Sequence, residues 1–178
     1  RPCRRPGPDI RPGEGGGGVL SVYLICVGKL KEKFYKDACA EYSKRLSAYC
    51  KLTVVELPEA KLPPRPSQSE INAALEKEGE AIRAKIPPSA RVAALCVEGR
   101  LRSSEELPRM FPVPGRSLEK HMVFLVGGSY GLHPSIKAEA SLQLSMSPMT
   151  FPHHLARVML LEQIYRAFKI QEGSSYHK

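Results

Sequence analysis

Apolar and polar positions follow two alternating patterns along this chain from residue 19 onward. The stretch "VLSVYLICV" (residues 19–27) is a near-continuous apolar run with β-branched residues, which is typical of a strand buried on both faces. The stretch "KEKFYKDACAEYSKRLSAY" (31–49) then repeats apolar residues at helical spacing. The pattern therefore predicts a strand followed by a helix.

The apolar strand pattern recurs four times in the rest of the chain. These runs are "LTVVEL" (52–57), "RVAALCV" (91–97), "HMVFLV" (121–126) and "LQLSM" (142–146). Because strands that alternate with helices and are apolar on both faces belong to covered parallel sheets, we expect an α/β fold with helices on both faces of a parallel sheet.

Local signals place the remaining helices. Ser67 and Glu70 form a capping box after a proline-rich loop, and this motif predicts a helix that continues to about Lys85. Ser103 and Glu106 could start another helix, which Pro108 and the two following prolines would keep short. The stretch "HLARVMLLEQIYRAFKI" (154–170) predicts a closing helix with apolar surface on more than one face, which suggests packing on the sheet and against a second subunit.

The first eighteen residues do not share this pattern. Residues 1–18 hold almost no apolar side chains and are dominated by Pro, Gly and Arg, so they cannot bury enough surface to offset the entropy cost of ordering. We therefore expect a disordered extension over 1–18 and a single domain over 19–178. The extension carries four arginines against Asp9 and Glu14, which is +2 of the chain's formal charge of +9. The remaining +7 belongs to the domain.

Composition sets limits on size, partners and compartment. A chain of 178 residues that is 42% hydrophobic can build one full core, or a small domain that dimerises. The net charge of +9 favours a polyanionic partner, with RNA or DNA ahead of an anionic membrane. The five cysteines contain no C-x-x-C pair and no spacing that would join a histidine as a zinc ligand, so we expect reduced thiols and no metal. No apolar run approaches the ~20 residues of a spanning helix, and we expect a cytoplasmic protein with no membrane partner.

The stretch "FLVGGSYGLH" (124–133) is the strongest candidate for a binding loop. Open α/β sheets bind ligands at the carboxyl ends of their strands, so the loops after the third, fourth and fifth strands form the predicted site. The stretch lacks the lysine of a phosphate-binding P-loop, and a dinucleotide fingerprint would follow the first strand. What remains is that Gly127 and Gly128 allow a close backbone approach, either by a neighbouring chain segment or by a flat ligand.

Several motifs in order resemble one family. "VGGSYGLH", "LSMSPMTFPHHLARVMLLEQIYRAFKI" and the terminal "YHK" are similar to the RlmH-type SPOUT methyltransferases, and "VGKLKEKFYKDACAEYSKRL" and "EKEGEAI" extend the resemblance from about residue 22 to the end. The family methylates N3 of a pseudouridine in bacterial 23S rRNA with S-adenosylmethionine. The resemblance implies an α/β knot with a deep C-terminal trefoil, a homodimer built on the closing helix, and as partner the 23S rRNA of the large subunit or the 70S ribosome.

The resemblance also assigns roles to residues. The cofactor pocket would be lined by Leu95, Gly127, Met146, Ser147, Pro148, Met149, Thr150 and Phe151. The base that accepts the imide proton would come from His153, Glu162, Tyr176 and His177, with His154 as a further candidate that does not match a family position. Arg157, Arg166 and Lys178 would contact RNA.

Plainer interpretations of the same residues stay open. Leu95 and Met146 could be ordinary core, Arg157 a solvated side chain, and Glu162 with Arg166 a surface pair at i,i+4 spacing. Two other functions are also open: a SPOUT methyltransferase that acts on tRNA or on a ribose 2′-hydroxyl, and a non-catalytic ribosome-assembly factor.

Overall fold

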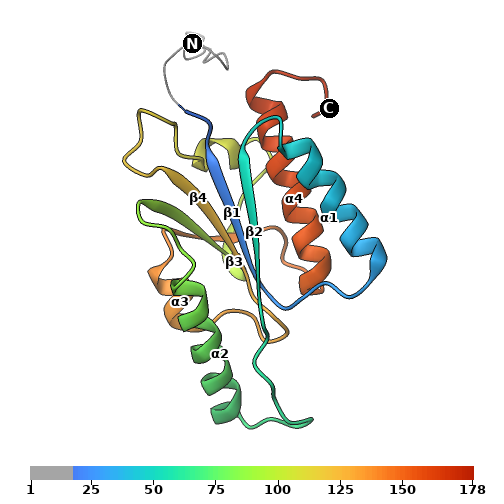
Figure 1. Cartoon of the computed structure of the whole chain (residues 1–178), viewed down its shortest axis with the longest axis vertical. Coiled ribbons are helices and arrows are strands. Elements are labelled where there is room, and N and C mark those ends of the chain that lie inside the picture. Colours follow the sequence, from blue (N-terminus) through green and yellow to red (C-terminus); the bar gives the residue numbers. More distant parts are fainter. Residues whose placement is uncertain (1–17) are drawn as a thin grey trace, which may run out of the picture.

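Strands and helices alternate along the chain (Figure 1), which the computed structural model describes over residues 18–178. In chain order the elements are β1 (Ser21–Val27), α1 (Lys33–Leu46), β2 (Lys51–Leu57), α2 (Gln68–Arg83), β3 (Ala90–Leu101), the 3₁₀ helix η1 (Leu107–Met110), β4 (His121–Val126), α3 (Pro134–Glu139), β5 (Leu142–Ser145) and α4 (His153–Gln171).

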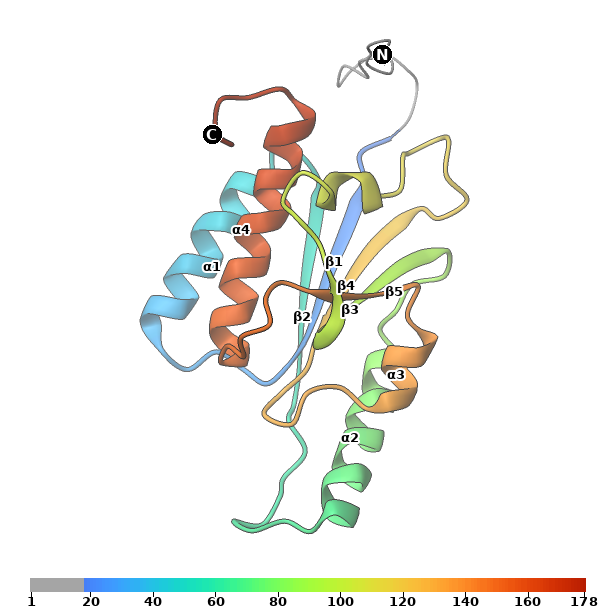
Figure 2. The same ribbon diagram turned by 180° about the vertical axis from the view of Figure 1, so that it is seen from behind.

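The five strands form one parallel sheet in the order β2-β1-β4-β3-β5. Helices α1 and α4 cover one face of the sheet, and α2 and α3 cover the other (Figures 1 and 2). The predicted α/β class and the helices on both faces are therefore confirmed. Because all strands run the same way, their carboxyl ends and the loops that follow them meet along one edge.

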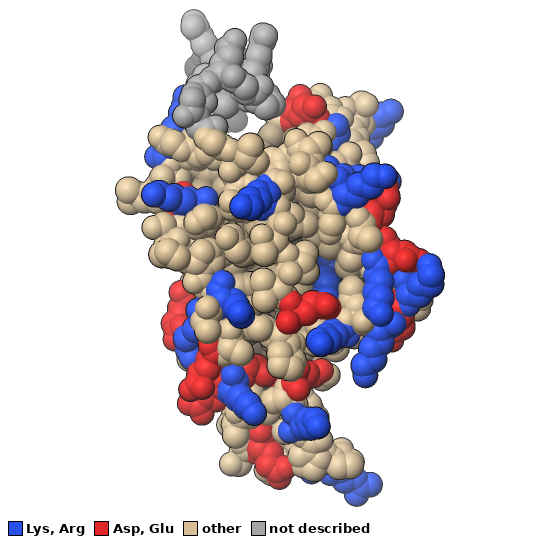
Figure 3. All heavy atoms as spheres, viewed as in Figure 1, with Lys and Arg blue, Asp and Glu red and all other residues tan. Residues whose placement is uncertain are grey.

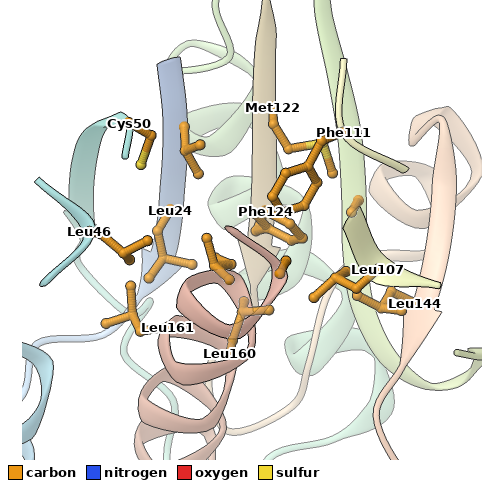
Figure 4. Close-up of a cluster of buried hydrophobic side chains, with 14 of the residues drawn as sticks. Leu24, Leu46, Cys50, Leu107, Phe111, Met122, Phe124, Leu144, Leu160 and Leu161 are labelled. Carbon is orange, nitrogen blue, oxygen red and sulfur yellow. The ribbon is translucent and has the colours of Figure 1, made fainter. Parts of the chain in front are cut away.

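Two clusters of buried hydrophobic side chains lie between the sheet and its helices, one on each face of the sheet. On one face Leu24 and Phe124 pack with Leu160 and Leu161 of α4 (Figure 4). On the other face the cluster joins residues of β1 and β4 to Ile82 of α2 and Ile136 of α3. Each fully buried side chain of this size contributes about 1.5–3 kcal/mol. This double coverage is what the continuous apolar runs of the strands require.

The capping signals behave as their chemistry predicts. Glu70 donates its backbone N–H to the Ser67 hydroxyl over 3.1 Å, and α2 starts directly after Ser67. Ser103 and Glu106 make the same reciprocal contacts, but only the four residues of η1 follow them. Helix α3 was not predicted. It is one short turn-like helix between β4 and β5, and its cap is the His133 ring, which accepts the Ser135 N–H over 3.1 Å.

Strand β3 is longer than its apolar run and bends around β5. The sequence predicts an end at residue 97, whereas β3 continues to Leu101. Leu95 and Arg100 both pair with Leu144, so the chain between them arches over that residue of β5. A Cβ at Gly99 would lie 2.8 Å from the backbone of β5, and glycine is therefore required at this crossing. The trefoil knot expected from the resemblance stays a prediction.

Some sequence features fall outside the described residues. The predicted extension over 1–18 does so except for Gly18, and Cys3 lies within it. Within 18–178, no helix combines the length and the apolar character needed to cross a bilayer. Cys26, Cys39, Cys50 and Cys96 carry free thiols, and burial raises the pKa values of Cys26 and Cys50 to about 12. Those two thiols are held in their unreactive protonated form.

Candidate active site

A cleft of about 580 Å³ opens at the carboxyl ends of β3, β4 and β5. Its walls come from five segments: residues 95–98 within β3, the glycine turn after β4, Lys137 of α3, the loop after β5 and the first turn of α4. The volume is within the usual range for a small-molecule site. The parallel sheet therefore creates one cavity from loops that the sequence separates by up to about sixty residues.

Most of the predicted cofactor residues meet in this cleft. The residues on its walls include Leu95, Gly127, Met146, Ser147, Met149, Thr150 and Phe151. Pro148 belongs to the same loop but is exposed and does not line the cavity. His153, predicted as a catalytic residue, also lines it. Their convergence is what a binding site requires, while their contact with a cofactor stays a prediction.

The glycines of the turn serve close packing within the chain. A Cβ on Gly127 would lie 2.4 Å from the backbone of Gly131, and a Cβ on Gly128 would lie 2.7 Å from the Glu59 carboxylate. Gly131 has a φ of +77°, which favours glycine, and it donates its N–H to the Gly128 carbonyl over 3.0 Å. Of the two interpretations of Gly127 and Gly128, the structure thus supports approach by a neighbouring chain segment.

Glu59 holds the glycine turn from outside. It lies two residues beyond β2, and its carboxylate accepts the backbone N–H of Ser129 over 2.8 Å. Burial acts to raise the pKa of Glu59, but hydrogen bonds from Ser129 and the nearby His153 and His154 outweigh it, so that the pKa is lowered. A carboxylate in its ionised form is a strong acceptor. Glu59 therefore acts as an anchor for the turn that forms one wall of the cleft.

Two neighbouring histidines begin α4. The His153 and His154 ring centroids are 4.2 Å apart, and His154 Nδ1 lies 3.6 Å from a Glu32 carboxylate oxygen. Burial, together with the proximity of His154, lowers the pKa of His153 below its ordinary value of 6.5. His153 is therefore a neutral imidazole at pH 7, on the cleft wall, with a lone pair that can accept a proton.

Arg157 does not fit the RNA contact expected for it, nor the solvated alternative. Its side chain is only 2% exposed, and it donates to Glu56 over 2.6 Å and to the Gly28 carbonyl over 2.8 Å. The guanidinium therefore ties the start of α4 to the ends of β1 and β2. Arg157 lies about one turn into α4, on the same buried face of the helix as Leu160 and Leu161. Its side chain therefore faces the sheet.

The predicted catalytic tail folds back onto its own helix. The Tyr176 hydroxyl donates to Glu162 over 3.2 Å, and Arg166 donates to the same carboxylate over 2.6 Å. The Arg166 guanidinium also lies 4.8 Å from the Tyr176 ring centre, and Tyr165 packs edge-on against that ring. Glu162 and Arg166 thus form the ion pair that their i,i+4 spacing predicts. The pair is half-buried rather than on the surface, and it holds the tail in place.

His177 completes this cluster in a defined tautomer. Its Nδ1 lies 3.3 Å from Arg166 and its Nε2 lies 2.8 Å from Glu105. Because a guanidinium can only donate, Nδ1 accepts and Nε2–H donates to the carboxylate. The bond from His177 lowers the pKa of Glu105 to about 2. Lys178 is exposed at the end of the chain, next to this cluster.

The chain does not bring the tail to its own cleft. His153 and Glu162 are nine residues apart on α4, which is about 13 Å along the helix axis. A second cavity of about 460 Å³ lies between the two regions, with Ser145 and Met146 shared with the first cleft and Glu162 on its far side. The predicted catalytic residues therefore form two groups: His153 at the cleft, and Glu162, Tyr176 and His177 beyond it.

Two residues that shape the cleft, Glu59 and Lys137, were not identified from the sequence. Glu59 follows the second strand, and the loops considered were those after the third, fourth and fifth strands only, although all strands end at the same edge. Lys137, which pairs with Glu98 on the cleft wall, belongs to the unpredicted helix α3. The carboxyl-end rule, applied to every strand, would have found Glu59.

Comparison with known proteins gives a family match and distant structural similarities. A family profile described as a predicted SPOUT methyltransferase matches residues 20–177. A solved structure described as a probable methylase family protein from Haemophilus influenzae Rd KW20 superposes with a TM-score of 0.49 at 12% sequence identity. That match covers 88% of this chain and 70% of the other.

Proposed function

This chain belongs to the SPOUT methyltransferases, a family that uses S-adenosylmethionine, and we propose that it methylates N3 of a pseudouridine in bacterial 23S rRNA. The observation that carries the proposal is the gathering of seven predicted cofactor residues and His153 around one cleft. The terminal Tyr-His-Lys is the feature that favours the pseudouridine enzyme over other RNA methyltransferases of the family, since it matches the RlmH type.

The cleft suits S-adenosylmethionine in size and in chemistry. Leu95, Val126 and Phe151 provide apolar walls for an adenine ring, and the glycine turn and the loop after β5 provide backbone donors and acceptors. The cofactor supplies a methyl group that is already activated by its sulfonium. The protein's own task is to place the acceptor nitrogen in line with that methyl group, which can contribute several kcal/mol to the rate.

The acceptor nitrogen must also lose its proton. His153 can take that proton at neutral pH, because its pKa is lowered and its ring borders the cleft. The tail offers His177, whose Nδ1 is occupied by Arg166, and Tyr176, whose pKa is raised by burial and by Glu162. A positioned base contributes about 10²–10⁴-fold to such a step.

A homodimer would unite the two groups of residues. Within one chain, the tail lies on the part of α4 that is remote from the cleft, so we propose that the tail of a second subunit completes the site. Val158 and Met159 are half-buried on α4 beside the second cavity, and a second subunit packed there would cover them.

Charge supports a ribosomal substrate. The domain carries most of the chain's +9. Lys178, the exposed last residue of the tail, and Arg166, which contacts His177, would meet phosphates. Because each phosphate contact releases condensed counterions, we expect binding to ribosomes to weaken steeply as salt increases. We propose the assembled large subunit or the 70S ribosome in the cytoplasm as the substrate.

The proposal is tested by mapping the modification. The purified chain is incubated with S-adenosylmethionine and with 70S ribosomes, large subunits or free 23S rRNA from a strain that lacks its own enzyme, and nucleosides are analysed by mass spectrometry. We expect 3-methylpseudouridine on ribosomal substrates. The variant Thr150→Trp, which fills the cleft from an exposed wall position, should abolish both cofactor binding and transfer.

Other outcomes would identify the alternatives. Methylation of tRNA or of a ribose would indicate another RNA methyltransferase of the family. Ribosome binding without cofactor binding in calorimetry would indicate an assembly factor.

A further inference from the structure

A row of four aromatic rings leads from the protein surface to the cleft. Phe34 and Tyr35 of α1 have ring centroids 4.3 Å apart, and the Tyr35 ring meets His154 edge-on at 5.9 Å. His154 in turn lies 4.2 Å from His153, which borders the cleft. We call these four residues the aromatic row. The beginnings of α1 and α4 lie side by side at the same edge of the molecule (Figures 1 and 2).

The outer end of the aromatic row is open to solvent. The Phe34 side chain is 64% exposed, although burial of a phenylalanine would contribute about 1.5–3 kcal/mol. A single exposed apolar residue is ordinary on a protein surface. Phe34 differs because its ring continues into three others that end at the cleft.

Exposed lysines surround this end of the aromatic row. Lys29, Lys31, Lys33 and Lys36 lie within eight residues of one another, against Glu32 and Asp37. Lys33 pairs with Asp37, whereas Lys29, Lys31 and Lys36 make no ion pair with any residue in 18–178. Figure 3 shows basic side chains gathered on the right of the view, with acidic ones between them. Four lysines against Glu32 and Asp37 leave a local formal charge of +2.

Exposed rings among lysines fit single-stranded RNA better than they fit protein. Unpaired bases stack on aromatic side chains while basic side chains track the phosphates of the strand. Protein interfaces, in contrast, are depleted of lysine at their cores. The free lysines around Phe34 thus favour a nucleic acid as the occupant.

We propose that the aromatic row is an RNA-entry platform, on which Phe34 stacks an unpaired nucleotide next to the one that is methylated, while Lys29, Lys31 and Lys36 hold its phosphates. The platform places the strand so that the neighbouring base reaches the cleft beside His153. This inference rests on the proposed function, because it assumes an RNA substrate for that same cleft.

The test replaces the outer ring and keeps the rest of the site. Phe34→Ala is compared with Phe34→Trp, which preserves stacking, and with Leu118→Ala, which removes an apolar side chain that is 94% exposed in the loop before β4. The readouts are the Kd for 70S ribosomes that lack the modification, the KM and kcat of methyl transfer, S-adenosylmethionine affinity by calorimetry, and oligomeric state by light scattering.

We expect Phe34→Ala to weaken ribosome binding and raise KM by about 5- to 160-fold, since the loss of one stacked base costs about 1–3 kcal/mol. Cofactor affinity and oligomeric state should not change. Phe34→Trp should restore binding, and Leu118→Ala should behave as the wild type. Lys31→Ala should reduce the slope of log Kd against log salt concentration by about one, because one phosphate contact and its released counterion are lost.

Three results would overturn the platform. Wild-type ribosome affinity and KM in Phe34→Ala would show that no base stacks there. A changed oligomeric state in Phe34→Ala would show that the ring belongs to a subunit interface. A wild-type chain that neither binds nor methylates ribosomes would refute the proposed function together with the platform, whereas an active wild type with an unaffected Phe34→Ala refutes the platform alone.

Discussion

Glu59 accepts the backbone N–H of Ser129 over 2.8 Å, and this bond joins the loop after β2 to the glycine turn after β4. The two loops follow strands that are not neighbours in the sheet, because β1 lies between them. Gly128 makes the contact possible, since a Cβ there would come within 2.7 Å of the carboxylate. The turn is therefore held from two sides, by Glu59 and by its own backbone.

The first prediction concerns this anchor. Glu59→Ala should weaken S-adenosylmethionine binding about 10-fold, because a hydrogen bond to a charged acceptor contributes about 1.5–3 kcal/mol to the order of the turn. Calorimetry with the cofactor measures the change. Glu80→Ala, which removes an exposed carboxylate on α2, should leave the affinity unchanged.

A double-mutant cycle sharpens this prediction. Gly128→Ala should also weaken cofactor binding, but less so when Glu59 is already alanine, because the added Cβ then gains room. Strictly additive effects of the two substitutions on cofactor affinity would contradict the contact between Glu59 and Gly128.

The second prediction concerns the buried guanidinium of Arg157. Arg157→Ala should reduce the free energy of unfolding by about 2–4 kcal/mol, because it leaves Glu56 and the Gly28 carbonyl without their buried donor. Urea denaturation measures the loss. Lys33→Ala removes the exposed pair with Asp37 and should cost less than about 0.5 kcal/mol. A small effect of Arg157→Ala, with ribosome binding lost instead, would return Arg157 to an RNA-binding role.

The third prediction concerns pH. Burial lowers the pKa of His153 below 6.5, so the folded protein binds this proton at a lower pH than the unfolded chain does. The contribution of His153 to stability is therefore present above pH 6.5 and is lost as the pH falls through the lowered folded value. NMR titration of the ring protons, assigned with His153→Gln, should give a midpoint below 6.5. A midpoint at or above 6.5 would contradict the lowered pKa. It would also argue against His153 as a proton acceptor that is neutral throughout the physiological pH range.

The fourth prediction concerns the tail. Truncation after Ser175 should leave dimerisation and cofactor binding near wild type and lower methyl transfer to ribosomes by about 10²-fold or more. Removal of Lys178 alone is the matched control and should mainly weaken ribosome binding. Full activity in the truncated chain would leave His153 as the remaining base.

Mixed dimers decide whose tail acts at which cleft. A truncated subunit with an intact cleft is combined with a Thr150→Trp subunit that retains its tail. Activity in the mixed dimer, where each parent is inactive, is expected if the tail serves the partner's cleft. An inactive mixed dimer would mean that each tail serves its own subunit.

The sequence by itself determined the class of fold and most of the residues that line the cleft. Continuous apolar runs can be buried only in a sheet covered on both sides, and the capping box at Ser67 is a local motif whose partners lie within one helical turn. The family resemblance named Leu95, Gly127 and the loop over 146–151, which all line the cleft except Pro148. The carboxyl-end rule for parallel strands pointed separately to the loops after the third, fourth and fifth strands.

The tertiary structure alone decided what these residues contact. The partner of Arg157 is Glu56, 101 positions away, and the partner of Ser129 is Glu59, 70 positions away. A repeating pattern within a short stretch of sequence cannot identify such pairs, because they depend on the order in which the strands join the sheet. The same reason explains why Tyr176 and His177 lie on their own α4 rather than at the cleft: a short terminal segment takes its place from the surface that it meets, here Glu162 and Arg166, and its own residues carry no signal for that choice.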